Sequence, residues 1–280
     1  MNLILQGLTA DRSVIDRISA LANAERVVPI HSTAYRCEGV SYSDELKARV
    51  DAECFAAQLD HTFVDGARKL SDFKLVAMDM DSTLITIECI DEIADMQGLK
   101  PQVAEITEAA MRGEIEFRES LTRRVALLKG LDASALQRVY DERLKLSLGA
   151  EKMLAAVQAA GLKTLLVSGG FTYFTDRMKT RLGLDYTHSN VLEIEDGKLT
   201  GRVVGVIVDA DEKKATVERV CAELGVSPKQ AIVMGDGAND LKMMGISGLS
   251  VAFRAKPVVR AQADVALNFV GLDGVLNLLS

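Results

Sequence analysis

The sequence lacks the residue patterns that mark several large classes of protein. Its four cysteines are scattered, with no Cys-x-x-Cys pair: Cys37, Cys54, Cys89 and Cys221. This spacing does not fit a zinc site or a disulfide scaffold, and it predicts free thiols in a reducing compartment. No apolar run approaches the roughly 18 residues of a membrane span, and the first residues lack the charged start of a signal peptide. We therefore expect a cytoplasmic protein without a membrane span.

Clusters of positive charge are missing as well. The chain has 33 Lys and Arg against 40 Asp and Glu, a net charge of −7, and no basic run. These features argue against nucleic-acid binding, and an anionic substrate would need local positive charge or a metal. With 280 residues, 48% of them hydrophobic and 26% charged, the chain is an ordinary globular protein. Its length allows about two domains.

One short stretch organises the rest of the sequence. Leu75–Met78 is an unbroken apolar run, which favours a parallel strand buried on both faces. Asp79 and Asp81 follow two residues apart, so in an extended chain both side chains leave the same side at the carboxyl end of the strand. Ligands of α/β sheets bind at that end. Two close carboxylates repel unless a cation or a shared proton relieves them, and Mg²⁺ is such a cation. An isolated Asp-x-Asp is more often a solvated turn or a helix cap.

The hydrophobic pattern predicts three parts. Alternating strands and helices over residues 1–70 predict a small α+β domain, with a linker at about 66–72. Residues 71–280 alternate strand and helix like a doubly wound parallel sheet. Into this second part, residues of about 88–148 insert helices that would cover the strand ends as a cap.

Later elements are predicted by local signals. Asp196-Gly197 predicts a hairpin that joins strands at 191–194 and 199–204. The pattern also predicts helices over 212–224 and 272–279.

Three more patterns suggest phosphate or metal chemistry. Ser168 and Gly169 lie between a predicted strand and a helix, where a hydroxyl and free N–H groups can hold a phosphate, although a tight turn is the commoner meaning. Lys213 and Lys214 begin a predicted helix, and paired lysines are usually a solvated face. The segment 235–240, Gly-Asp-Gly-Ala-Asn-Asp, follows an apolar strand. It is an incomplete dinucleotide fingerprint whose two acids would repel a pyrophosphate, so a metal site fits better.

Taken together and in this order, the motifs resemble those of the haloacid dehalogenase-like (HAD) phosphatases. The first motif is Asp79-Met80-Asp81-Ser82-Thr83-Leu84, the second is 167–171, the third is Lys214 and the fourth is 235–240. Within that superfamily the chain most resembles the phosphoserine phosphatases. The resemblance implies a HAD-like Rossmannoid core with a helical cap. It also implies that residues 1–70 are a degenerate version of the ACT-type regulatory modules that precede some of these enzymes.

The resemblance implies roles for the motif residues. Spacing does not tell which carboxylate attacks, but the family pattern makes Asp79 the nucleophile and Asp81 the general acid and base. The pattern places the phosphoryl group against Ser168, the Gly169 amide and Lys214. It implies that Mg²⁺ is held by Asp79, the backbone carbonyl of Asp81 and Asp236, with Asn239 and Asp240 in support.

Four cap residues match the family's substrate contacts. Glu88 would take the substrate's ammonium group, and the planar guanidinium of Arg124 suits its carboxylate. Met111 and Phe117 would close over the site. Taken singly, each has an ordinary interpretation: a helix-start acid, a solvated arginine and two core residues.

The implied activity is Mg²⁺-dependent hydrolysis of O-phospho-L-serine through an aspartyl-phosphate, the last step of serine biosynthesis. The alternatives are transfer of the phosphoryl group to another alcohol such as homoserine, a different small monoester as substrate, and a serine-sensing binding protein whose working part is the N-terminal domain. By family analogy, the N-terminal domain could also form a homodimer.

Overall fold

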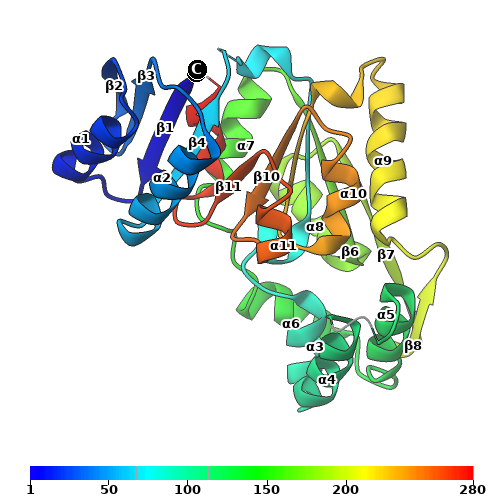
Figure 1. Ribbon diagram of the computed structural model, residues 1–280. Helices are drawn as coiled ribbons and strands as arrows, with labels where there is room; N and C mark the ends of the chain where they lie inside the picture. The colour runs from blue at the N-terminus through cyan, green and yellow to red at the C-terminus, as the bar shows by residue number, and fades with distance from the viewer. Residues whose placement is uncertain (67, 112–113, 280) are drawn as a thin grey trace.

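The computed structural model describes residues 1–66, 68–111 and 114–279, except for the side chain of Met111. It contains two sheets and a group of helices (Figure 1). None of the helices in these ranges combines the length and the apolar character that a membrane span requires.

The N-terminal sheet is antiparallel, and its strand order is β2-β3-β1-β4. Its strands are β1 (Asn2–Gly7), β2 (Arg26–His31), β3 (Ala34–Glu38) and β4 (Leu59–Val64). Two helices, α1 (Arg12–Leu21) and α2 (Asp44–Ala56), pack with it around a small core of its own. Asp11 and Ser43 cap these helices, because each side chain accepts a hydrogen bond from a backbone N–H of the first turn.

The second sheet has seven strands in the order β11-β10-β9-β5-β6-β7-β8. All neighbouring strands are parallel except β7 and β8, the predicted hairpin. The strands are β5 (Leu75–Met78), β6 (Lys163–Phe171), β7 (Tyr186–Glu195), β8 (Lys198–Val204), β9 (Ala231–Gly235), β10 (Leu249–Phe253) and β11 (Val265–Leu267). The central strand β5 is buried along its whole length, as its apolar run predicts. The chain leaves β5 toward β6 on one side and returns to β9 on the other, so its carboxyl end is a topological switch point.

Helices cover both faces of this sheet. The face with Leu75 and Ala77 packs against α9 (Ala210–Glu223), α10 (Leu241–Met244) and α11 (Pro257–Arg260). The face with Val76 and Met78 packs against α7 (Ala150–Ala159) and α8 (Thr172–Leu182). The predicted doubly wound α/β core is therefore confirmed.

Between β5 and β6, and in addition to α7, the described residues form four α-helices. These are α3 (Cys89–Asp95), α4 (Lys100–Met111), α5 (Phe117–Ala126) and α6 (Ser134–Glu142). Figure 1 shows them gathered at one end of the large sheet, where α5 contacts β8. They lie where the sequence predicted a cap.

Two helices differ from the sequence prediction. Helix α9 begins at Ala210 rather than at Glu212, because the side chain of Asp209 accepts hydrogen bonds from the N–H groups of Asp211 and Glu212. The closing segment Leu272–Leu278 is a 3-10 helix. Gly274 in its middle is a weak helix former, and a Cβ at this position would lie 2.5 Å from Val270 Cγ2.

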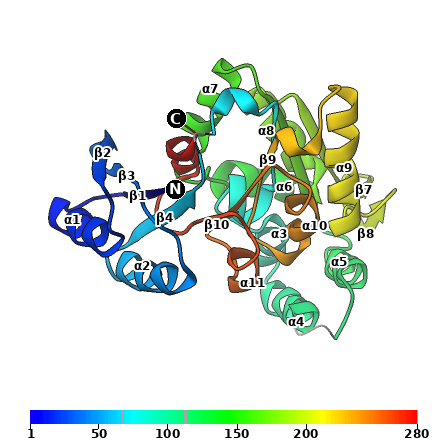
Figure 2. The same ribbon diagram turned by 45° about the horizontal axis from the view of Figure 1, so that its top comes forward.

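The N-terminal sheet is fixed to the core by buried polar contacts. The carboxylate of Asp60, on β4, accepts hydrogen bonds from the backbone N–H groups of Asn268, Phe269 and Val270 at 2.7, 2.9 and 2.9 Å. Asn277 donates to Gln6 on β1 at 2.7 Å. Figure 2 shows this sheet, with α1 and α2, lying to one side of the large sheet.

Candidate active site

The carboxyl end of β5 brings three acids together. Asp79 immediately follows the strand, whereas Asp236 and Asp240 follow its neighbour β9. Carboxylate oxygens of these three residues lie within 4.8 Å of one another. Parallel strands explain this meeting, since neighbouring strands end at the same edge of the sheet.

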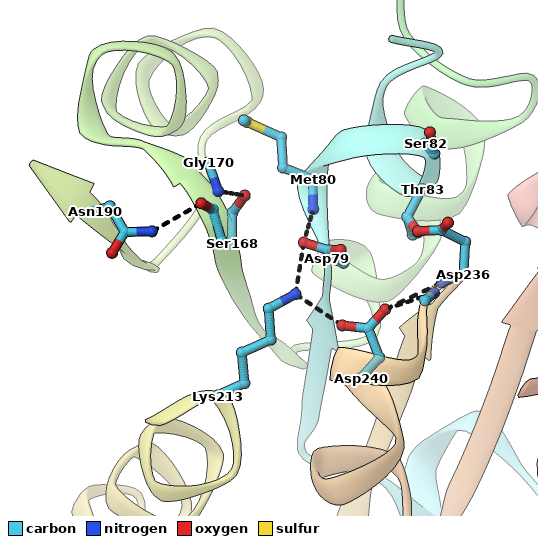
Figure 3. A network of polar contacts seen from close by, with 12 residues as sticks. Asp79, Met80, Ser82, Thr83, Ser168, Gly170, Asn190, Lys213, Asp236 and Asp240 are labelled. Carbon is cyan, nitrogen blue, oxygen red and sulfur yellow. Dashed lines mark hydrogen bonds and ion pairs between the residues drawn. The ribbon is translucent and has the colours of Figure 1, made fainter. Parts of the chain in front are cut away.

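Lys213 provides the positive charge at the centre of this group. Its Nζ lies 2.9 Å from Asp79 Oδ1 and 2.7 Å from Asp240 Oδ1, and its side chain is fully buried (Figure 3). The two carboxylates raise the pKa of Lys213 against the effect of burial, so the lysine stays charged. Burial, together with the charges of Asp240 and Asp236, raises the pKa of Asp79, and Lys213 opposes this rise.

The prediction that Lys214 reaches the Asp79 carboxylate is wrong. The Lys214 side chain is 40% exposed, and its Nζ lies 3.7 Å from Glu218 on the outer face of α9. Consecutive helical residues point about 100° apart, so only one of the two lysines can face the sheet. The sequence does hold a signal for Lys213: it stands four, seven and eight residues before Val217, Val220 and Cys221, which form the buried stripe of α9.

Asp240 is a positioning residue whose two oxygens are both occupied. Oδ1 binds Lys213, and Oδ2 accepts from the backbone N–H groups of Asp236 and Gly237 at 3.2 and 3.0 Å. Gly235 is required here, because a Cβ at this position would lie 2.4 Å from Asp240 Oδ2. Asp240 therefore holds both Lys213 and the loop that presents Asp236.

The acid group fits a divalent cation. Lys213 pairs with two of the three carboxylates, Asp79 and Asp240. Burial, then repulsion from Asp240 and Glu88, raises the pKa of the third, Asp236, to about 7. Thr83 Oγ1 donates to Asp236 Oδ1 at 3.3 Å, an orienting contact that the sequence analysis did not assign. Since the oxygens of Asp240 are occupied, Asp79 and Asp236 are the carboxylates best placed to bind a metal.

Asp81 lies apart from the three acids, in a turn formed by Met80–Leu84. Its Oδ1 is buried without a hydrogen-bond partner among the described residues. Burial, then the charge of Glu88, raises the pKa of Asp81 to about 8. A carboxyl group that holds its proton near neutral pH suits a general acid. The turn also places Ser82 in the left-handed region at φ 55°, a strained conformation for a residue other than glycine.

Ser168 and the two glycines after it form another side of the site. Figure 3 shows Ser168 and Gly170 on the side of Asp79 away from Asp236. Ser168 Oγ accepts a hydrogen bond from Gly170 N at 2.9 Å. Gly170 packs so closely that a Cβ there would lie 3.1 Å from Asp81 Oδ2. Asn190, another residue that the sequence analysis missed, donates to Gly169 O at 2.7 Å and accepts from Val208 N at 2.9 Å. This buried amide fixes the Ser168–Gly170 segment against the start of α9.

Two of the predicted cap residues, Glu88 and Phe117, contact this site. Phe117 Cζ lies 3.2 Å from the position of a Cβ on Gly169. Glu88, just before α3, accepts a hydrogen bond from Ser82 Oγ at 2.6 Å. Burial lowers the pKa of the half-buried Arg124, while the charges of Asp91, Glu88 and Asp81 raise it. Arg124 Nε donates a hydrogen bond to Ser120 O on its own helix at 3.4 Å. Asn239 is half-buried beside Gly237, and the side chain of Met111 lies outside the described part.

Comparisons with known proteins agree with this geometry. The sequence profile of the haloacid dehalogenase-like hydrolases matches residues 73–248, which include Asp79, Asp81, Asp236 and Asp240. The chain belongs to this family. Phosphatases of this family depend on a metal, and the acid group found here is one that could bind it.

Several proteins that resemble this chain are named phosphoserine phosphatase. A "Phosphoserine phosphatase" from Polaromonas is 61% identical over 216 residues, which cover 75% of this chain and 92% of that protein. A probable phosphoserine phosphatase from Vibrio cholerae, solved without ligand, matches 99% of this chain and 86% of its own, with 37% identity and a TM-score of 0.85. Two phosphoserine phosphatase structures, one substrate-bound and one a phospho-aspartyl intermediate analogue, each match 74% of this chain with 36% identity and a TM-score of 0.70.

Proposed function

We propose that this protein is a phosphoserine phosphatase that hydrolyses O-phospho-L-serine to L-serine and phosphate. The observation that carries the proposal is the pairing of Asp79 with Lys213 at the end of β5. Hydrolases of this name that resemble the chain, one of them 61% identical, support the choice of substrate.

The first step is attack by a carboxylate oxygen of Asp79 on phosphorus. The bond from phosphorus to the serine oxygen breaks, and the proton on Asp81 passes to that oxygen, so neutral serine leaves. Lys213 lies 2.9 Å from Asp79 Oδ1, where its charge orients the nucleophile and stabilises the phosphoryl oxygens. Ser168 and the Gly169 amide bind the phosphoryl oxygens from another side of the site.

The second step is hydrolysis of the aspartyl-phosphate. Asp81, now ionised, takes a proton from water as the water oxygen attacks phosphorus. The bond to Asp79 breaks, and phosphate and the original carboxylate are restored. The same carboxyl group thus serves as acid and then as base, which a pKa raised to about 8 permits near neutral pH.

We propose Mg²⁺ as the metal, held by Asp79, Asp236 and the backbone carbonyl of Asp81. When bound, Mg²⁺ supplies positive charge to the phosphoryl oxygens. Hard oxygen ligands and a phosphate substrate favour Mg²⁺ over softer metals.

Specificity is assigned to the cap. Glu88 pairs with the substrate's ammonium group and Arg124 with its carboxylate, while Phe117 closes over the Ser168–Gly170 segment.

We divide the chain into an N-terminal domain of residues 1–70, a catalytic domain of residues 71–280 and a cap of about 88–148. The four cysteines are buried and unpaired, which supports a cytoplasmic location. A homodimer formed through the N-terminal domain is part of the same proposal.

Phosphate release from O-phospho-L-serine, with and without Mg²⁺, tests this function. We expect metal-dependent release that exceeds release from p-nitrophenyl phosphate, and no release or phosphoenzyme from Asp79→Asn. Arg124→Ala should lose activity on phosphoserine but keep activity on the aryl phosphate, which has no carboxylate to bind. Equal activity on both substrates in the wild type would contradict the specificity. O-Phosphohomoserine formed from phosphoserine and added homoserine, in place of free phosphate, would indicate a phosphotransferase.

A further inference from the structure

We propose that Arg118 and Asp209 form a cap–core ion pair that positions Lys213 for phosphoryl transfer. The inference rests on the proposed function, and it assigns a task to two residues outside the acid group. Arg118 belongs to the cap helix α5, and Asp209 stands immediately before α9, the helix that carries Lys213. Arg118 Nε lies 2.6 Å from Asp209 Oδ2.

Asp209 uses its two oxygens for two different elements. Oδ2 binds Arg118, while Oδ1 accepts from the N–H groups of Asp211 and Glu212 at 3.1 and 3.0 Å. Its backbone carbonyl accepts from Lys213 N at 2.9 Å. The carboxylate that anchors the cap therefore also organises the helical turn from which Lys213 reaches Asp79.

Neighbouring contacts place this pair beside the phosphate-binding segment. Phe117, adjacent to Arg118, packs on Gly169. Asn190 connects Gly169 O to Val208 N, which precedes Asp209. A shift of the cap at Arg118 would thus reach Gly169 through Phe117 and Lys213 through Asp209.

The two side chains differ in exposure, and this limits the size of the expected effect. Arg118 is 58% exposed and Asp209 is 14% exposed. Such pairs contribute little to stability, so the pair should matter mainly through geometry. Small displacements of a group that contacts the reacting atoms have large effects on rate.

Kinetics of four variants of the full-length enzyme test the proposal: Arg118→Ala, Arg118→Lys, Asp209→Asn and the double variant Arg118→Ala/Asp209→Asn. Asparagine is as good an N-cap as aspartate, so Asp209→Asn weakens the ion pair and keeps the cap of α9. We expect Arg118→Ala and Asp209→Asn each to lower kcat about 3- to 10-fold, with KM changed less than about twofold. The double variant should be no worse than either single one, and Arg118→Lys should recover most of the loss.

Arg123→Ala is the matched control. Arg123 is on the same helix, is similarly exposed and pairs with Glu119 of the same helix at 2.5 Å. Its kcat should stay within about 1.5-fold of the wild type. Equal losses in Arg123→Ala and Arg118→Ala would overturn the proposal, as would additive losses in the double variant or a change confined to KM.

Amide hydrogen exchange gives a readout that does not depend on turnover. Arg118→Ala should speed exchange at Asp211 and Glu212, the two N–H groups held by Asp209, and Arg123→Ala should not. Unchanged exchange would overturn the proposed link between the cap and α9. If the wild type fails to hydrolyse phosphoserine, the proposed function falls, and the exchange experiment still decides whether the pair orders the start of α9.

Discussion

At the scale of single residues, the site depends on one buried lysine among acids. Lys213 contacts Asp79 and Asp240 and is fully buried. Removing it would leave two buried carboxylates without a counter-charge, which is far more costly than losing a surface pair. Stability and catalysis are therefore both expected to depend on this side chain.

The adjacent lysines make a matched test of that role. Lys213→Ala should lower kcat by at least about 100-fold and the free energy of unfolding by about 3 kcal/mol, because it removes the cation that faces Asp79. Lys214→Ala should leave both near the wild-type values, since the Lys214 side chain is 40% exposed and its Nζ lies 3.7 Å from Glu218. Steady-state kinetics measure kcat, and urea unfolding measures the free energy of unfolding. A larger loss from Lys214→Ala would restore the sequence-based assignment.

The residues that the sequence identified and those that it missed differ in a physical way. Asp79, Asp81 and Asp236 follow strands and Ser168 lies near the end of one, each within a short motif, so local pattern locates them. Asn190 is a lone amide on β7 whose partners, Gly169 and Val208, are distant in the sequence. Nothing local distinguishes it from a surface asparagine. The choice between Lys213 and Lys214 likewise depends on which side of α9 faces the sheet, and the motif alone does not give that orientation.

At the scale of elements, the start of β6 is tied to the segment before β7 by one acid. Asp185 accepts from Lys163 Nζ at 2.6 Å and from Thr164 N and Oγ1 at 2.9 and 3.0 Å. Burial acts to raise the pKa of Asp185, but these hydrogen bonds outweigh burial and lower it from its ordinary 3.8. A group whose pKa is lowered in the folded state stabilises that state above its unfolded pKa and stops doing so as the pH falls through the folded pKa.

This sign gives a prediction for the pH dependence of stability. Asp185→Asn should lower the free energy of unfolding by about 1 kcal/mol at pH 7, and the difference from the wild type should shrink as the pH falls below about 4. Urea unfolding between pH 7 and pH 3 measures it. Glu142→Gln, in an exposed pair within α6, is the control and should show little difference at either pH. A loss that stayed constant down to pH 3 would mean that Asp185 acts through its shape and not through its charge.

At the scale of the whole molecule, the N-terminal sheet lies outside residues 73–248, the part of the chain that matches the family. The structures that match 74% of this chain are themselves 99% covered, so about a quarter of this chain has no counterpart in them. The N-terminal sheet with its helices, residues 2–64, is of that size and has its own core. The family's chemistry therefore does not require it.

The contacts that join the N-terminal sheet to the rest of the molecule could not be predicted from the sequence. The alternation of strands and helices predicted both sheets, because each pattern is local. The junction depends on Asp60, a buried acid on β4 whose three backbone donors lie more than 200 positions later in the chain. Apolar periodicity does not report such a contact, since the partner atoms belong to the backbone.

Replacing Asp60 separates the stability of the junction from catalysis. Asp60→Ala leaves the buried N–H groups of residues 268–270 without an acceptor, which should lower the free energy of unfolding by about 2–4 kcal/mol. The catalytic acids are on other strands, so kcat per folded molecule should stay within about twofold of the wild type.

Asp16→Ala, which removes an exposed pair with Arg12 in the same sheet domain, is the matched control and should lower the free energy of unfolding by less than about 1 kcal/mol. Urea unfolding, followed by assays at temperatures where the variant is fully folded, makes both measurements. Equal destabilisation by the two variants would show that water replaces the Asp60 carboxylate, and a large fall in kcat would show that the N-terminal sheet acts on the active site through β11 and its neighbours.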